Sequence, residues 1–234
     1  MMPQHDTSAI KFGNYMALMT TTSPQEHFAR FYKATGDFYE LDVLLKCREL
    51  YFPDTIIMDV GANIGNHTIF FAGVLNARVI AVEPNRPVFD ILEQNIARNG
   101  QSSSVQAIWG AAGATEGTGS VIVDTPSNAG VARFVKNEGD VPLFRIDSLN
   151  VDVPVSIIKV DVEGMEHDVL IGAEVLLRKW RPFVFAEAHD RSSLVKLGSF
   201  LSTLGYELRG RYATTPTYLF GSTDEQARQR VLWG

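Results

Sequence analysis

Acidic side chains recur in this sequence at the ends of short apolar runs, and these are the positions at which it could do chemistry. Carboxylates grouped beside a pocket can accept hydrogen bonds from a ligand, take a proton from a hydroxyl, or hold a cation. A histidine near such a group could also take a proton, because imidazole titrates near neutral pH. The residues concerned are Asp59, Glu83, Asp161, Glu163, Glu166, Glu187 and His189.

The segment 56–72 has the pattern of a strand, a tight turn and the start of a helix. A β-branched apolar run ends at Asp59, and glycines follow at positions 61 and 65, where they permit the turn and a close approach of the backbone to a ligand. The spacing differs from the G-x-G-x-x-G loop of dinucleotide-binding proteins, and the charge of Asp59 suits a cationic ligand better than a phosphate. The loop therefore favours S-adenosylmethionine. The residues expected to contact it are Asp59, Gly61, Ala62, Asn63 and Gly65.

Glu83 ends the next apolar run and is followed by Pro84. An acid at this place can accept hydrogen bonds from both ribose hydroxyls of an adenosine ligand. The dipole of the following helix could alternatively favour an acid here. Asp59 and Asn63 also have structural alternatives to ligand contact: Asp59 could cap the loop, and Asn63 could be only a turn residue. Because Glu83 follows the glycine loop, we favour ligand binding for Glu83 and Pro84.

A third group of acids follows the apolar run 155–160. Asp161, Glu163 and Glu166 should reach the same rim as Asp59 and Glu83, since the carboxyl ends of parallel strands meet at one edge of a sheet. Glu163 and Glu166 could instead serve the next helix N-terminus. We accept that role for Glu166, expect a functional one for Asp161, and leave Glu163 open.

The next strand end brings Glu187 and His189 to this rim. Proton acceptance or hydroxyl orientation is therefore expected of four candidate catalytic residues, and Asp161 is also expected to contact the cofactor. Lys159 could pair with one of the acids or belong to the site. His67 is left out, because a lone histidine in a first helical turn is more often a packing residue. The candidate catalytic residues are Asp161, Glu163, Glu187 and His189.

The elements that must position these residues alternate between strands and helices, which predicts a mostly parallel sheet with right-handed crossovers. A closing pair of strands without an intervening helix suggests an antiparallel edge. Residues 1–36 are expected to form an N-terminal tail with a helical lead-in that starts near Ser23, and 37–234 a single α/β domain. Strands are expected at 55–60, 78–83, 104–110, 120–124, 155–161, 183–188, 206–212 and 217–221, with a further strand pair open within 125–145. Helices are expected at 37–50, 65–75, 86–99, 166–180 and 191–204, with a short one at the C-terminus.

Composition narrows the classes of function. The 234 residues carry a net charge of −6, which argues against nucleic acid bound through a broad basic surface. The single cysteine, Cys47, excludes an intrachain disulfide framework and lies in a helical pattern that would bury it. No apolar stretch approaches the ~20 residues of a membrane-spanning helix, and the N-terminus does not have the pattern of a signal peptide. We expect a cytoplasmic protein without stable membrane insertion.

Three segments together resemble the FkbM-type family of S-adenosylmethionine-dependent methyltransferases of class I. They are Asp-Val-Gly-Ala-Asn-Ile-Gly-Asn-His-Thr from position 59, Val-Glu-Pro-Asn from 82, and Ile-Lys-Val-Asp-Val-Glu-Gly-Met-Glu from 158, and the resemblance covers roughly 41–220. It implies a Rossmann-like, seven-stranded, mostly parallel sheet with helices on both faces and an antiparallel last strand. The implied activity is O-methylation of a sugar, glycan or other natural-product hydroxyl. The segment 105–112 has no acid for the adenine amine, so Gln106 or a backbone carbonyl is the alternative.

Two other functions stay open on the residues alone. One is a nicotinamide-dependent oxidoreductase, against which the missing G-x-G-x-x-G counts. The other is a protein that binds S-adenosylmethionine without turnover, since a fold and a site outline do not prove activity. The acid cluster would suit a divalent metal, but no ligand spacing demands one. The acceptor and the oligomeric state are not encoded in any pattern that we can interpret.

Overall fold

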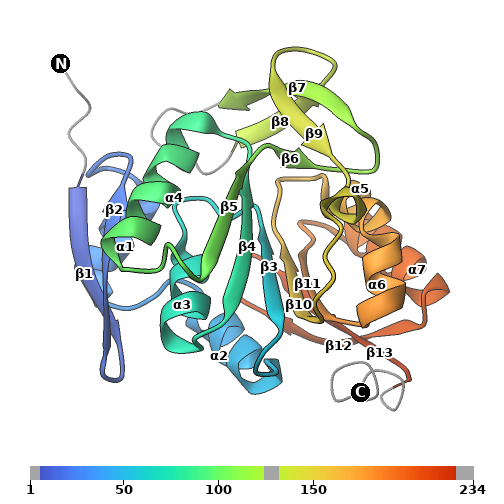
Figure 1. Cartoon of the computed structure of the whole chain (residues 1–234), viewed down its shortest axis with the longest axis horizontal. Coiled ribbons are helices and arrows are strands. Elements are labelled where there is room, and N and C mark those ends of the chain that lie inside the picture. Colours follow the sequence, from blue (N-terminus) through green and yellow to red (C-terminus); the bar gives the residue numbers. More distant parts are fainter. Residues whose placement is uncertain (1–5, 124–131, 225–234) are drawn as a thin grey trace.

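A seven-stranded sheet runs through the centre of the structure, a computed structural model that describes residues 6–123 and 132–224 (Figure 1). The strand order is β12-β13-β11-β10-β3-β4-β5. The five strands from β11 to β5 are parallel to one another, whereas β13 is antiparallel to both of its neighbours. The bounds are β3 Ile56–Val60, β4 Arg78–Glu83, β5 Val105–Trp109, β10 Val155–Val160, β11 Phe183–Glu187, β12 Tyr206–Tyr212 and β13 Thr217–Ser222.

The predicted mostly parallel sheet is confirmed, and the last strand is antiparallel as the resemblance implied. The closing pair of strands forms an antiparallel edge of the sheet as predicted, and β13 lies between β11 and β12. A short turn after Tyr212 folds β13 back onto β12, and the other side of β13 pairs with β11, with Val184 opposite Phe220. The edge strand is therefore β12.

Helices cover both faces of the sheet, and each face has its own apolar core. Figure 1 shows α3 and α4 on one side and α5, α6 and α7 on the other. The predicted helix over 166–180 is divided in two at Ala173. The bounds are α2 Leu41–Leu50, α3 Asn66–Val74, α4 Arg86–Arg98, α5 Glu166–Gly172, α6 Glu174–Trp180 and α7 Arg191–Thr203.

Helix α2 begins later than predicted and buries a different face. It starts at Leu41, and its buried residues are Val43, Leu44 and Cys47. Leu45, which the apolar pattern placed on the buried stripe, is 42% exposed. The predicted burial of Cys47 is confirmed.

The N-terminal region, expected to be a tail, contains a β-hairpin of β1 (Asp6–Phe12) and β2 (Tyr15–Thr21). Its inward side chains join the core, which is why the segment is ordered. The hairpin is tied to α4 by Asn95, whose side-chain oxygen accepts a hydrogen bond from Thr20 N at 2.8 Å and whose amide donates to Thr20 O at 2.9 Å. Ile10, Ala17 and Met19 are the inward residues.

Helix α1 (His27–Thr35) follows the hairpin and begins at His27 rather than near Ser23. The side chain of Glu26 accepts hydrogen bonds from both the backbone N and the hydroxyl of Thr22, each at 3.1 Å. Glu26 therefore fixes the turn that enters the helix.

A smaller sheet with the order β6-β9-β7-β8 lies beyond the end of β5 (Figure 1). It accounts for the strand predicted at 120–124 and for the extra pair left open within 125–145. The 3-10 helix η1 (Ile146–Leu149) then leads back toward β10. The predicted C-terminal helix lies outside the described residues. The bounds are β6 Ala111–Ala112, β7 Gly117–Val123, β8 Ala132–Lys136 and β9 Val141–Phe144.

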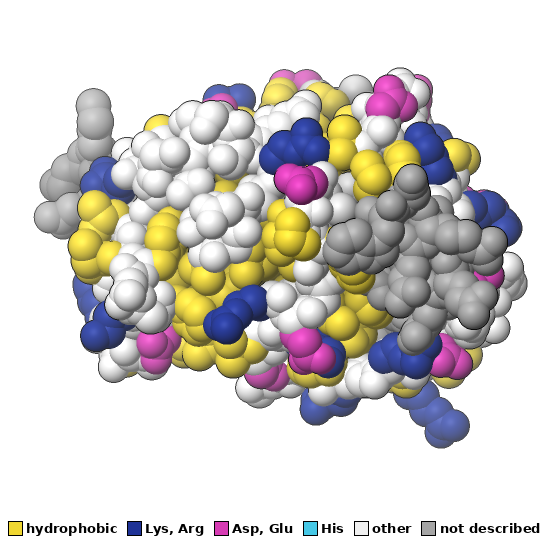
Figure 2. All heavy atoms as spheres, turned by 60° about the horizontal axis from the view of Figure 1, so that its bottom comes forward, with side chains coloured by type: hydrophobic (Ala, Val, Ile, Leu, Met, Phe, Trp, Pro, Cys, Tyr) yellow, Lys and Arg dark blue, Asp and Glu magenta, His cyan; other side chains and the backbone are white. Residues whose placement is uncertain are grey.

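The face at the bottom of Figure 1 carries mixed side chains. Figure 2 shows Lys and Arg lying among Asp and Glu on this face, with apolar side chains between them. Charges of one sign do not dominate the part of the face that is coloured. Across the described residues, none of the helices combines the length and the apolar character needed to cross a bilayer.

Candidate active site

A cavity of about 410 Å³ lies at the carboxyl ends of β3, β4, β10 and β11. This is the edge of an open parallel sheet at which ligands bind. Strand ends supply most of its polar groups, while α1 and the turn before α2 supply a further wall. The polar lining residues are His27, Tyr39, Glu40, Asn63, Asn66, His67, Glu83, Lys159, Asp161, Glu163, Glu187, His189 and Thr215.

The loop after β3 is held against the ends of two other strands. The backbone N–H groups of Gly61 and Ala62 both donate to the carbonyl of Val82, each at 2.9 Å. Gly61 has a φ of +80°, and a Cβ there would lie 1.7 Å from the carbonyl oxygen of Asp161. Only glycine can adopt this backbone conformation and leave room for the carbonyl oxygen of Asp161.

Gly65 has a different role from the one expected. It is the N-cap of α3 with a φ of +95°, and a Cβ there would meet Leu92 Cδ1 at 2.8 Å. It does not line the cavity, whereas Gly61, Ala62 and Asn63 do. Gly65 therefore shapes the loop through packing against α4.

Asp59 lies behind the loop instead of facing the cavity. It is fully buried, its Oδ2 accepts a 2.6 Å hydrogen bond from the hydroxyl of Thr68, and its Oδ1 lies 3.5 Å from Lys159 Nζ. Burial raises the pKa of Asp59, while Lys159 and Thr68 oppose that shift. The structure thus gives Asp59 a supporting position and leaves direct contact with a ligand to the loop itself.

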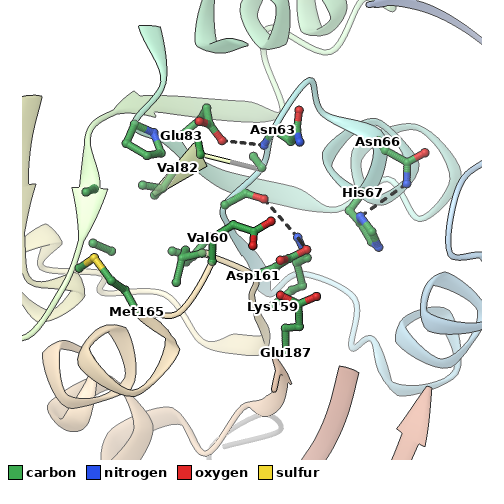
Figure 3. Close-up of a pocket in the computed structure, with 18 of the residues that line it drawn as sticks. Val60, Asn63, Asn66, His67, Val82, Glu83, Lys159, Asp161, Met165 and Glu187 are labelled. Atoms are coloured by element: carbon green, nitrogen blue, oxygen red, sulfur yellow. Dashed lines mark hydrogen bonds and ion pairs between the residues drawn. The ribbon is translucent and has the colours of Figure 1, made fainter. Parts of the chain in front are cut away.

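Lys159 joins the two carboxylates that flank the loop. Its Nζ lies 3.3 Å from Asp161 Oδ2 (Figure 3) and 3.5 Å from Asp59 Oδ1. It also donates to the carbonyl of Gly61 at 3.2 Å. Burial alone would lower the pKa of Lys159, but the carboxylates of Asp161, Asp59 and Glu40 outweigh burial and raise it. Lys159 is therefore charged and holds the loop in place.

Glu83 lines the cavity at the end of β4. Its Oε2 accepts from Asn63 N at 2.9 Å (Figure 3), and its Oε1 accepts from Asn85 N at 2.8 Å. Burial raises the pKa of Glu83 to about 7, although the two backbone donors pull it down. The carboxyl group is thus fixed in position with lone pairs left for a ligand.

Asp161 and Glu187 form a coupled pair at the ends of β10 and β11. Burial and the Asp161 carboxylate raise the pKa of Glu187 to about 9. Burial also acts to raise the pKa of Asp161, but Lys159 and a hydrogen bond with Glu187 outweigh it and lower that pKa. At neutral pH Asp161 is therefore the ionised partner and Glu187 holds the proton. Figure 3 shows Lys159, Asp161 and Glu187 directed toward one another.

Glu163 and His189 complete the acid cluster as predicted from their strand ends. His189 Nε2 lies 3.2 Å from Glu187 Oε2 and 3.6 Å from Glu163 Oε2. Glu166 does not belong to this cluster: its Oε1 accepts from the backbone N of Val162 at 3.2 Å and of Gly164 at 3.0 Å. These bonds brace the loop just before α5, next to the helix N-terminus at which Glu166 was expected to act.

Sequence reasoning missed the turn before α2, which supplies Tyr39 and Glu40 to the wall of the cavity. Tyr39 is fixed by Asn66, whose Oδ1 accepts from Tyr39 N at 2.9 Å and whose Nδ2 donates to Tyr39 O at 3.0 Å. Glu40 follows in a left-handed conformation, and burial raises its pKa to about 7. Its Oε2 lies 3.5 Å from Nε2 of His67, a residue excluded from the predicted site.

Burial lowers the pKa of His67 to about 3, so His67 is neutral. No local sequence pattern marks Tyr39 or Glu40 as a site residue, because neither comes after a strand or after a glycine loop like the one at 61–65. For His67 the available signal was its closeness to the loop after β3. Gln106, which was considered as a partner for the adenine amine, is exposed and does not line the cavity. The lining that follows β5 consists of Gly110, Ala111 and Ala112.

Residues 59–208 match the Methyltransferase FkbM domain. The chain belongs to this methyltransferase family. Hexuronic acid methyltransferase AglP of Haloferax volcanii is 32% identical over 168 residues, which are 68% of this chain and 67% of that protein. The AMB antimetabolite synthetase AmbE of Pseudomonas aeruginosa is 26% identical over 182 residues, but the chain spans only 8% of its length.

Structural comparison agrees on the fold of this FkbM-family methyltransferase. A crystal structure of Methyltransferase FkbM from Methylobacillus flagellatus KT superposes with a TM-score of 0.56 at 22% identity. The match covers 74% of this chain and 47% of that one, so the chain spans about half the length of that structure. The family membership confirms the resemblance and favours methyl transfer over the nicotinamide chemistry that the sheet alone left open.

Proposed function

We propose that this protein transfers a methyl group from S-adenosylmethionine to a hydroxyl of a sugar or glycan. The observation that carries the proposal is the carboxyl group of Glu83, fixed by two backbone donors and facing a cavity at the switch edge of the sheet. A group in this position suits the paired hydroxyls of a ribose. The glycine loop beside it lets the backbone approach the same ligand.

The cavity offers distinct places for the parts of the methyl donor. Gly61 and Asn63 would contact its methionine portion, and Glu83 its ribose. The adenine would lie near Pro84 and the segment 110–112, where small side chains leave space beside the backbone. Asp59 and Lys159 would act through the loop, since Asp59 does not reach the cavity.

The acceptor side is the wall built by α1, the turn before α2 and β8. Aromatic and polar side chains alternate there, which suits a sugar ring with an apolar face and several hydroxyls. The relative from Haloferax volcanii is a hexuronic acid methyltransferase, which supports a sugar-type acceptor here. The lining residues on this side are His27, Phe28, Tyr39, Glu40 and Phe134.

Asp161 is the proposed base. S-adenosylmethionine supplies a methyl group that is already activated by its sulfonium. What this chain must do is align the acceptor oxygen with that methyl and accept the hydroxyl proton, and alignment alone can contribute ~7–11 kcal/mol. Asp161 is ionised and lines the cavity. His189 is the second candidate, with Glu163 and Glu187 orienting it.

Calorimetric titration of the purified protein with S-adenosylmethionine, S-adenosylhomocysteine and NAD tests the donor. We expect binding of the first two and none of NAD; NAD binding without S-adenosylmethionine binding would overturn the proposal. A screen with a labelled methyl group across uronic acids, neutral sugars, glycolipids, small alcohols and peptides tests the acceptor. Transfer confined to peptides or to amines would refute a sugar hydroxyl.

A further inference from the structure

We propose that Glu163, Glu187 and His189 form a binding site for a divalent transition-metal ion such as Mn²⁺ or Zn²⁺. One ligand atom from each of these side chains lies within 4.8 Å of the other two. The three come from the ends of β10 and β11 and line the proposed methyl-transfer cavity. Within 6–123 and 132–224, this is the group of His, Cys, Asp and Glu residues with such spacing.

The spacing of the ligand atoms fits a common ion. His189 Nε2 lies 3.2 Å from Glu187 Oε2 and 3.6 Å from Glu163 Oε2. Two ligand atoms at about 2.1 Å from one ion are roughly 3.0–3.4 Å apart for octahedral or tetrahedral angles. The two distances from His189 are therefore within a few tenths of an ångström of the spacing around one ion, and the two glutamate oxygens lie within 4.8 Å of each other.

A buried oxygen in the cluster lacks a hydrogen-bond donor. Glu187 is only 6% exposed, and its Oε2 has no hydrogen-bond partner in the described part of the chain. His189 Nε2 lies 3.2 Å away, but this contact does not have the geometry of a hydrogen bond. An unsatisfied buried oxygen is costly, by about 1–3 kcal/mol. A cation bound to Oε2 would give this oxygen the partner that it lacks.

Carboxyl groups also outnumber lysine and arginine side chains around the cavity. Five carboxyl groups line it, and Lys159 is the one Lys or Arg among its described lining residues. The ammonium of Lys159 is engaged with Asp59, Asp161 and Gly61. It forms no ion pair with the cluster, where His189 is the basic partner of both acids. The five carboxyl groups belong to Glu40, Glu83, Asp161, Glu163 and Glu187.

The donor set indicates the class of ion. Imidazole nitrogen suits zinc, iron and other transition metals, while carboxylate oxygens also suit manganese. Mg²⁺ and Ca²⁺ prefer oxygen donors alone, so a site with His189 should bind them more weakly. Three protein ligands leave coordination positions open. Resting on the proposed function, those positions would bind oxygens of the acceptor beside Asp161.

Metal binding is tested on the whole chain after chelator treatment, without donor or acceptor. We expect Mn²⁺ and Zn²⁺ to bind with one site per chain, and Mg²⁺ to bind at least about tenfold more weakly. Glu163→Gln and His189→Gln should each raise the Kd for Mn²⁺ by more than about tenfold. Electron spin-echo spectra of bound Mn²⁺ should show an imidazole nitrogen that disappears in His189→Gln.

Two control variants separate ligation from general attraction of cations. Glu40→Gln removes a carboxyl group, and His27→Gln an imidazole, from the same cavity but outside the cluster. Both should keep the Kd for Mn²⁺ within about twofold. His189 is half-exposed, so His189→Gln should fold normally, and its unperturbed thermal unfolding would show this.

The proposal is overturned if Mn²⁺ and Zn²⁺ do not bind below millimolar concentration. It is also overturned if Glu40→Gln weakens Mn²⁺ binding as much as Glu163→Gln does, or if the nitrogen signal persists in His189→Gln. Failure of the methyl-transfer proposal would look different. In that case Mn²⁺ would bind as described while S-adenosylmethionine would not.

Discussion

The ammonium group of Lys159 lies 3.2 Å from the carbonyl oxygen of Gly61, so a buried side chain of β10 holds the ligand loop that follows β3. The same ammonium is paired with Asp161 and Asp59 on either side of that loop. One cation thereby links the loop to the proposed base.

Gly61→Ala should disrupt the loop far more than a glycine replacement at a similar φ elsewhere. The added Cβ would lie 1.7 Å from the carbonyl oxygen of Asp161. We expect a loss of at least about 3 kcal/mol in the free energy of unfolding and of S-adenosylmethionine binding. Gly100→Ala is the matched control, with a φ of +68° and open space around it. It should cost only about 1 kcal/mol, from backbone strain. Urea unfolding measures both, and equal losses would contradict the close-packing explanation.

Asn95→Ala should loosen the N-terminal hairpin from the ligand loop. Asn95 is fully buried, and its side chain joins Thr20 to Ile64 through hydrogen bonds of 2.8–2.9 Å to their backbone groups. Its removal leaves three buried backbone groups unpaired, so we expect a loss of about 3 kcal/mol in stability. Hydrogen exchange of the hairpin amides should also speed up.

Asn99→Ala provides the comparison for this prediction. Asn99 makes the same kind of paired bonds to the hairpin, at Leu18, but on a partly exposed side of α4. Water can replace these bonds, so the loss of stability should be about 1 kcal/mol or less. If Asn99→Ala proved as damaging as Asn95→Ala, burial would not be the reason for the effect.

The affinity for S-adenosylmethionine should fall as the pH falls through about 7. Burial raises the pKa of Glu83 to about 7, and the ionised carboxylate is the better acceptor for ribose hydroxyls. Above that pH the carboxylate predominates and binding is tightest. Between pH 8 and pH 6 the ionised fraction drops about tenfold, and the Kd should rise by a similar factor. Calorimetry across this range measures the effect. Glu83→Gln should bind weakly at every pH, and a pH dependence that survives in this variant would assign the titration to another group.

Asp161→Asn should lower turnover by roughly 10²–10⁴-fold, the range for a positioned base, while the Kd for S-adenosylmethionine changes little. Asparagine keeps the shape of the side chain but cannot accept the hydroxyl proton. Asp152→Asn, at an exposed carboxylate before β10, serves as the control and should have full activity. Single-turnover transfer of a labelled methyl measures the chemical step. Full activity in Asp161→Asn would remove Asp161 from the reaction.

The site residues at the strand ends could be predicted from the sequence, because an acid follows the apolar run of each of these strands. Glu83, Asp161 and Glu187 all line one cavity as that pattern requires. The direction of Asp59 was not predictable. Strand β3 is buried on both faces, so the alternation that usually separates an inner from an outer face is missing.

The acceptor wall was beyond prediction for another reason. Tyr39 and Glu40 reach the cavity through contacts with Asn66 and His67 on α3, far along the chain. Such contacts are decided by tertiary packing and leave no periodic trace. The hairpin at 6–21 was missed because α3 and α4, far along the chain, provide the surface that buries its inward residues.

The place of β13 between β11 and β12 has a consequence for synthesis on the ribosome. The backbone of β11 pairs with β13, with Glu187 opposite Thr217, and Ala188 N donates to Pro216 O at 3.0 Å. A nascent chain that has not yet exposed residues 216–222 leaves one side of β11 unpaired. The rim that carries Glu187 and His189 is thus not complete until residues 216–222 have been made. Nascent chains stalled before this point should bind chaperones at the open edge of β11.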